Sequence, residues 1–138
     1  MQRSSLLFSI AIATAGCGGT EMVGTSTLIA GTYRADKLLV TPTGQTPINV
    51  LDAGGSLIIT IEASGATSGS LYVPPTIGGV PFGVSMAGTA TVTATTVQFT
   101  QSADTFVRDL TWTRSTNRLE VTDQQAGGAS YTISLVKQ

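Results

Sequence analysis

The chain has 138 residues, with seven Lys and Arg against eight Asp and Glu, no histidine and one cysteine. The near-neutral charge and the lack of any basic run argue against a nucleic-acid partner. The lack of histidine excludes Ser-His-Asp and Cys-His catalysis and imidazole metal sites. We therefore expect a protein that is not an enzyme and that uses no metal and no other cofactor.

The first 16 residues have the pattern of a cleaved secretory signal peptide. Arg3 and the free amine give a positive start, residues 6–15 form an apolar run, and residues 14–16 are small. An apolar helix of this length rises only ~15 Å, about half of a bilayer core, so it is too short to span a membrane. We expect cleavage between Gly16 and Cys17, which removes residues 1–16.

Cys17 directly follows two small residues, and Ala15-Gly16-Cys17 resembles the lipobox of bacterial lipoproteins, with Thr14 where leucine is usual. That resemblance implies a diacylglycerol on the Cys17 thiol and a further acyl chain, such as palmitate, on the new amine. Several acyl chains would hold the protein stably on a membrane, with residues 17–28 as a flexible tether. Gly18 resembles the sorting position of lipoproteins sent to the outer membrane. The resemblance thus implies a bacterial cell-envelope protein, lipid-anchored in the outer membrane and facing the periplasm or the cell surface; the alternative is an incidental cysteine.

From residue 29 onward the chain predicts an all-β domain. It is rich in Thr, Val, Ile, Ser and Gly, and short runs of alternating apolar and polar residues are separated by turn residues. The expected strands cover residues 31–40, 56–62, 68–73, 88–94, 97–100, 105–113, 118–122 and 131–136.

These expected strands follow one another through short connections, which is typical of an antiparallel up-and-down meander. Closing about eight such strands into a barrel would remove exposed edges. A flattened sandwich is the alternative, and an outer-membrane barrel is disfavoured because the outward positions are polar. Residues 29–138 therefore predict a single barrel domain, with an interior that is filled by side chains or holds one small ligand.

Gly31-Thr32-Tyr33 in the first strand resembles the Gly-x-Trp signature of lipocalin-like barrels, with tyrosine in place of tryptophan. In that family the aromatic side chain closes one end of an eight-stranded barrel. The last strand lacks the arginine that packs over this aromatic residue in the family. The resemblance implies a fold more than an activity, because such barrels host many functions.

A candidate ligand-binding wall follows from the expected strand over residues 105–113. Side chains two residues apart point to the same face of a strand, which groups Phe106, Arg108, Leu110 and Trp112. An interior Arg108 would need a carboxylate or an anionic ligand. The alternatives are an Arg108 at the rim that reaches water or an acidic neighbour, and a Trp112 that belongs to the core.

The connection over residues 74–83 is long, apolar and rich in proline. Proline stiffens such a segment, and Ile77, Val80 and Phe82 could cover a barrel mouth or meet a partner. The alternative is that the segment folds back and plugs one end of the barrel.

Two functions fit these observations. The first is a lipid-anchored, lipocalin-like protein that binds a small apolar or amphiphilic ligand, which requires an internal cavity. The second is a filled-core barrel that works through its surface, as a hydrolase inhibitor or as an envelope assembly or interaction module. The sequence leaves open which ligand or envelope protein partner is bound.

Overall fold

A computed structural model describes residues 28–138 of the chain. The expected signal peptide over residues 1–16, the cleavage site between Gly16 and Cys17, the lipid on Cys17 and nearly all of the tether lie outside the described residues. Among the residues that are described, no helix is long and apolar enough to cross a membrane.

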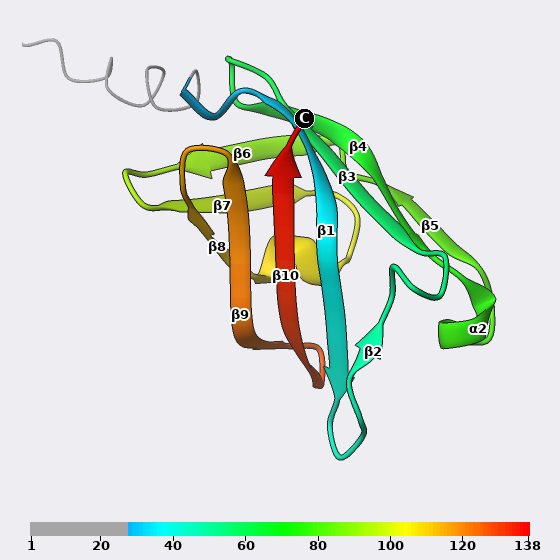
Figure 1. Cartoon of the computed structure of the whole chain (residues 1–138). Coiled ribbons are helices and arrows are strands. Elements are labelled where there is room, and N and C mark those ends of the chain that lie inside the picture. The colour runs from blue at the N-terminus through cyan, green and yellow to red at the C-terminus, as the bar shows by residue number, and fades with distance from the viewer. Residues whose placement is uncertain (1–27) are drawn as a thin grey trace, which may run out of the picture.

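The described chain consists of strands joined by tight turns, and two short helical segments lie between the strands (Figure 1). The helices are α2 (Pro75–Gly78) and α3 (Phe106–Asp109). The strands are β1 (Gly31–Pro42), β2 (Ile48–Asn49), β3 (Ser56–Ile61), β4 (Ala66–Val73), β5 (Phe82–Ser85), β6 (Gly88–Val92), β7 (Thr96–Gln101), β8 (Thr111–Arg114), β9 (Arg118–Ala126) and β10 (Ala129–Lys137).

Eight of these strands close into an antiparallel up-and-down barrel, which confirms the predicted fold class. Strand β1 pairs with β3 on one side and with β10 on the other, which closes the ring β1-β3-β4-β6-β7-β8-β9-β10. Strands β2 and β5 lie off this ring, paired with β1 and β4 respectively. The flattened sandwich is not what forms, because the strands are hydrogen-bonded in one continuous ring rather than in two separate sheets.

A β-bulge at Asp36 sets which side chains of β1 point into the barrel. The register with β10 shifts between Ala35 and Lys37, so Asp36 is the extra residue. Tyr33 is buried before the bulge, and Leu38 is buried after it. Because a one-residue slip reverses the inward and outward faces of a strand, the bulge turns Leu38 and Val40 inward.

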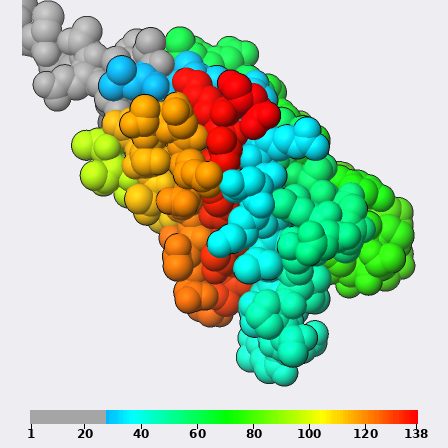
Figure 2. Space-filling view, viewed as in Figure 1, coloured from blue at the N-terminus to red at the C-terminus, as the bar shows by residue number. Residues whose placement is uncertain are grey.

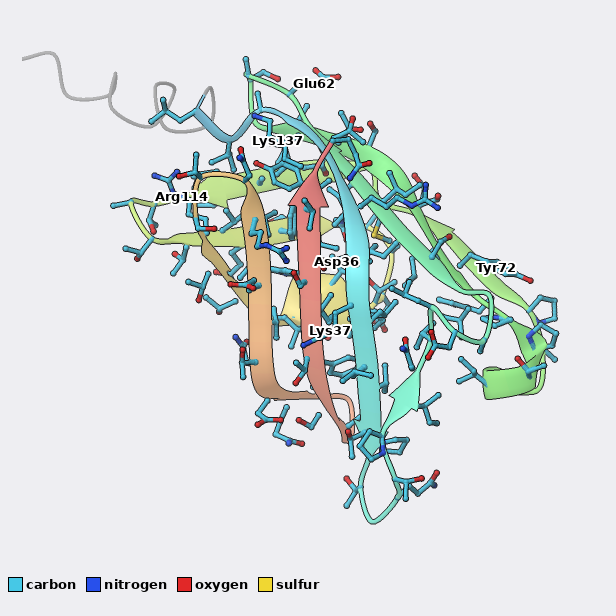
Figure 3. All side chains as sticks on the ribbon, in the orientation of Figure 1. Asp36, Lys37, Glu62, Tyr72, Arg114 and Lys137 are labelled. Atoms are coloured by element: carbon cyan, nitrogen blue, oxygen red, sulfur yellow. The ribbon has the colours of Figure 1, made fainter. Side chains whose placement is uncertain are left out.

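The bulge also directs Asp36 across the adjacent strand β10 toward β9 (Figure 3). The Arg118 guanidinium on β9 donates to the Asp36 carboxylate at 3.0 Å and to the Ser134 hydroxyl of the intervening strand β10. Desolvation raises the pKa of Asp36, but hydrogen bonding from Ser134 and Arg118 and the charge of Arg118 outweigh it, so the net pKa is lowered. The ion pair ties together the three strands at the closure of the ring.

Replacing Asp36 by asparagine should lower the free energy of unfolding at neutral pH by up to about 1 kcal/mol, the ordinary size of a half-exposed ion pair. Because the folded pKa of Asp36 is lowered, its contribution is complete above the ordinary carboxyl pKa and is lost as the pH falls through the folded value. Urea unfolding of both proteins from neutral pH down to about pH 2 measures the difference.

Glu62→Gln is the matched control, because Glu62 is exposed and forms no ion pair within residues 28–138. A difference between Asp36→Asn and the unmodified chain that persists unchanged at low pH would contradict the role assigned to the ion pair.

The core fills the half of the barrel around the start of β1. Tyr33 is fully buried there and its hydroxyl donates to the Ile29 carbonyl at 2.8 Å. Trp112 and Phe99 meet edge to face, with ring centroids 5.9 Å apart, and the Trp112 indole donates to the Val107 carbonyl. Buried Tyr and Trp need such partners for their polar atoms, so this half of the interior is filled and fixed.

The wall of the barrel divides at Met86 and Ala87, between β5 and β6. The Met86 carbonyl accepts hydrogen bonds from the Thr67 hydroxyl at 2.9 Å and from the Gln101 amide at 3.1 Å. Strand β6 continues the ring to β7, whereas β5 pairs only with the far half of β4. The interior beside β5 is therefore closed by side chains rather than by a continuous hydrogen-bonded ladder.

Candidate functional site

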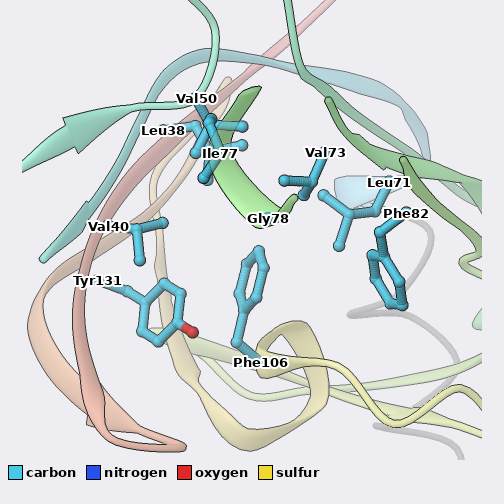
Figure 4. Close-up of a pocket in the computed structure, with 10 residues that line it drawn as sticks. All are labelled: Leu38, Val40, Val50, Leu71, Val73, Ile77, Gly78, Phe82, Phe106 and Tyr131. Carbon is cyan, nitrogen blue, oxygen red and sulfur yellow. The ribbon is translucent and has the colours of Figure 1, made fainter. Parts of the chain in front are cut away.

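A cavity of about 300 Å³ occupies the end of the barrel away from Tyr33 (Figure 4). Its walls come from strands, from both helical segments and from the residue after β2. Its lining is almost entirely apolar and contains no charged residue: Leu38, Val40, Val50, Leu71, Val73, Ile77, Gly78, Phe82, Phe106 and Tyr131. Ligand pockets of roughly 300–1,000 Å³ with apolar walls and few polar groups are typical of small-molecule sites.

Local sequence explains how each wall is built. The bulge at Asp36 turns Leu38 and Val40 of β1 inward, as described above. On β4 the alternation brings Leu71 and Val73 to the same inner face. Helix α2 begins with a proline at its first turn and is capped after Gly78 by Gly79, whose φ of 77° lies in the left-handed region that suits glycine. This tight turn carries Ile77 over the cavity.

Phe106 and Tyr131 form the opposite wall and stack on each other, with ring centroids 4.5 Å apart and planes 20° apart. Figure 4 shows the Tyr131 hydroxyl at the cavity beside Phe106. Burial and, second, the charge of Asp109 raise the pKa of Tyr131 above its ordinary value. The hydroxyl therefore stays protonated at neutral pH and can donate a hydrogen bond to a ligand.

The expected strand over residues 105–113 is wrong. Residues Phe106–Asp109 form the helical turn α3, and only Thr111–Arg114 form strand β8. The buried residues Val107 and Leu110 are three apart, which is helical spacing, and the Leu110 amide donates to the Phe106 carbonyl at 3.2 Å. The predicted wall of Phe106, Arg108, Leu110 and Trp112 therefore does not exist as one strand face.

The four side chains of that predicted wall lie in different places. Phe106 lines the cavity, whereas Leu110 and Trp112 are fully buried in the core and do not line it. Arg108 is partly exposed and donates to the Asp104 carboxylate at 2.6 Å, with Asp109 at 3.7 Å. Arg108 thus pairs with acidic neighbours on the outside of α3, which is the alternative given above, and it is not part of a ligand-binding wall.

The connection over residues 74–83 is brought to the cavity, as expected of a covering segment. Ile77 and Phe82 line it, but Val80 is 68% exposed and faces away. No residue of α2 is fully buried. Pro74 is buried and Ile77 packs against the core, so the segment covers the cavity while its start is held by the core.

Most of the cavity was not predicted from the sequence. The sequence predicts Tyr131 at the start of the last strand and gives it no role, and strand alternation alone does not distinguish Leu38, Val40, Leu71 and Val73 from other apolar residues. One pattern in the sequence could have indicated Leu38 and Val40. The apolar positions of β1 are odd-numbered before Asp36-Lys37, at 33 and 35, and even-numbered after it, at 38 and 40. Within residues 28–138, no group of three or more Cys, Asp or Glu side chains is placed to hold a metal ion.

No protein-family model matches this chain, and comparisons with curated proteins and with solved structures gave no match either. The function therefore has to be argued from the geometry of the cavity and of the surface.

Proposed function

We propose that this protein binds one small apolar or amphiphilic molecule in the cavity at the open half of its barrel. The observation that carries the proposal is an apolar cavity of about 300 Å³ in a barrel whose other half is filled. Transferring apolar ligand surface from water into such a cavity provides the driving force for binding. The ligand is small, because the volume lies at the lower end of the range for ligand pockets.

The lining also indicates the chemistry of the ligand. A buried charge without a partner is costly, and no charged side chain lines the cavity. The ligand portion inside the barrel is therefore uncharged, and a hydrogen-bond acceptor on it would meet the Tyr131 hydroxyl. A charged head group, where the ligand has one, would stay outside the mouth.

The second part of the proposal concerns location. The similarity of residues 14–17 to a lipobox supports a lipid anchor on Cys17 in a bacterial envelope, and the barrel supports a lipocalin-like domain on that anchor. The alternative, a filled-core barrel that acts only through its surface, has less support because half of the interior is not filled.

Filling the cavity should abolish binding. Val73→Trp places an indole among the lining residues, and the affinity for the neutral fluorescent probe N-phenyl-1-naphthylamine should fall at least roughly tenfold. The measurement is a fluorescence titration of the full chain carrying Cys17→Ser, which removes the expected lipid and so the need for detergent.

Two variants serve as controls for that titration. Val136→Trp adds the same indole at a partly exposed position of β10 that does not line the cavity, and Arg108→Leu removes the outer ion pairs of α3. Both should bind the probe like the parent chain. Equal loss of binding in all three variants, or no binding by the parent, would contradict the proposal.

Tyr131→Phe tests the polar group of the cavity. The variant should bind 2-decanone roughly 2–10-fold more weakly than the parent, because one neutral hydrogen bond contributes about 0.5–1.5 kcal/mol. Its affinity for decane, which cannot accept a hydrogen bond, should change little. Displacement of the naphthylamine probe measures both ligands, and equal effects on ketone and alkane would show that Tyr131 acts only through its ring.

The anchor has a separate test in the intact mass of the protein purified from bacterial membranes in detergent. We expect a chain that begins at Cys17 and carries the mass of several acyl chains, because one chain alone gives only marginal membrane binding. Cys17→Ser should yield an unacylated protein. An unmodified Cys17 thiol in the membrane-purified chain would overturn the anchor and leave the cavity proposal standing.

A further inference from the structure

One long stretch of the barrel wall contributes no charged side chain of its own. The sequence between Glu62 and Asp104 contains no Asp, Glu, Lys or Arg, and this stretch forms β4, α2, β5, β6 and β7. Tyr72, Val80 and Phe82, which are 39–68% exposed, all lie within it. They do not form one patch, because Phe82 lies opposite Val73 and faces the cavity, whereas Tyr72 points to the other face of the sheet.

Strand β5 lies at the edge of this wall and has one free side. It pairs with β4 alone, and it lies at the outer margin of the molecule in Figures 1 and 2. Gly83 and Ser85 are both exposed. The other strand off the ring, β2, is only two residues long, half-buried and close to Asp52, so it offers no comparable edge.

The direction of the β5 backbone groups follows from its register with β4. The Met86 amide donates to the Gly69 carbonyl at 3.0 Å, which makes Gly69 and Met86 a hydrogen-bonded pair. Such pairs alternate with non-hydrogen-bonded pairs in an antiparallel ladder. The backbone N–H and C=O groups of Gly83 and Ser85 therefore point away from β4, and they have no partner within residues 28–138.

The neighbours of these two residues limit how far a new strand can pair. Pro81, the preceding outward position, has no backbone N–H to donate. The Ala87 amide, the following one, already donates to the Ser85 side-chain hydroxyl at 3.2 Å. The free edge is thus confined to Gly83 and Ser85, with Val84 at its centre.

We propose that two copies of this protein associate by antiparallel pairing of β5 with β5 about a two-fold axis at Val84. Gly83 then lies opposite Ser85 of the partner subunit, and Ser85 opposite the partner's Gly83. This is the single register that uses all of the outward donors and acceptors, and it is self-complementary, as a two-fold interface requires.

The lack of charge favours a second copy as the occupant of the edge. A two-fold axis brings identical surfaces together, so any charge near it would face its own copy, and like charges placed opposite each other are destabilising. Strand β5 and the half of β4 that it pairs with bring no charge to the axis, because no charged residue lies between positions 63 and 103. Protein edges that avoid pairing commonly carry lysine or another charge, and β5 carries none. Because β5 has only four residues, the dimer is weak and reversible.

The first test is the oligomeric state of the full chain carrying Cys17→Ser, measured by sedimentation velocity over a roughly hundredfold dilution series. The parent should show a monomer–dimer equilibrium. Ser85→Lys, which puts a charge on the edge, should weaken dimerisation at least roughly tenfold. Gln98→Lys is the matched control, an exposed position of β7 in the same uncharged wall but away from the edge, and it should dimerise like the parent.

The second test fixes the register. With Cys17→Ser in place the chain has no thiol, so Val84→Cys provides the only one, and non-hydrogen-bonded antiparallel neighbours lie at roughly 4.5–5.5 Å between Cβ atoms. Mild oxidation should cross-link Val84→Cys into a disulfide dimer much faster than Gln98→Cys, which is more exposed. A parent that stays monomeric, equal weakening by both lysine variants, or equal cross-linking of both cysteine variants would each overturn the proposal.

Discussion

The structure depends most on the break at Met86 and Ala87. The Met86 carbonyl accepts hydrogen bonds from two side chains, those of Thr67 and Gln101, so the chain can leave the ladder at this point with that carbonyl still satisfied. Strand β6 begins at Gly88, opposite Gln101, where β7 ends. The pairing between β6 and β7 therefore stops next to Met86 and Ala87. At the cavity end of the barrel, β5 and α3 take the places that β6 and β7 hold elsewhere in the wall. The cavity lies between side chains of these two elements.

The ring of strands followed from the sequence, whereas the cavity did not. Period-two alternation and turn residues were sufficient to place seven strands of the barrel, with boundaries off by a few residues, and the end of the expected strand over 105–113 overlaps the eighth, β8. The segment over 105–113 also alternates, yet buried Val107 and Leu110 show that it packs at helical spacing. In a run this short, apolar residues occur both two apart and three apart. Alternation alone therefore cannot distinguish the strand period of two from the helical period of 3.6.

Bulges are the second reason why the cavity was not predicted. Asp36 in β1 shifts the register with β10, and in β9 Asp123 adopts a positive φ of 48° where the register with β10 shifts again. Each bulge changes which residues face inward, so a uniform alternation assigns the second half of the strand to the wrong face. Leu38 and Val40 become cavity residues only after this change of phase is taken into account.

The same break separates an inner site from an outer one. The side chains of Leu71, Val73 and Phe82 face the cavity, while the outward backbone groups of Gly83 and Ser85 lie in the plane of the sheet. A charge at Ser85 therefore acts on pairing without entering the cavity, and an indole at Val73 acts on the cavity without touching the free edge. Local rules are broken here in two ways, by an unfilled interior and an unprotected edge. Such concentrated exceptions are expected at functional sites rather than in structural parts of a fold.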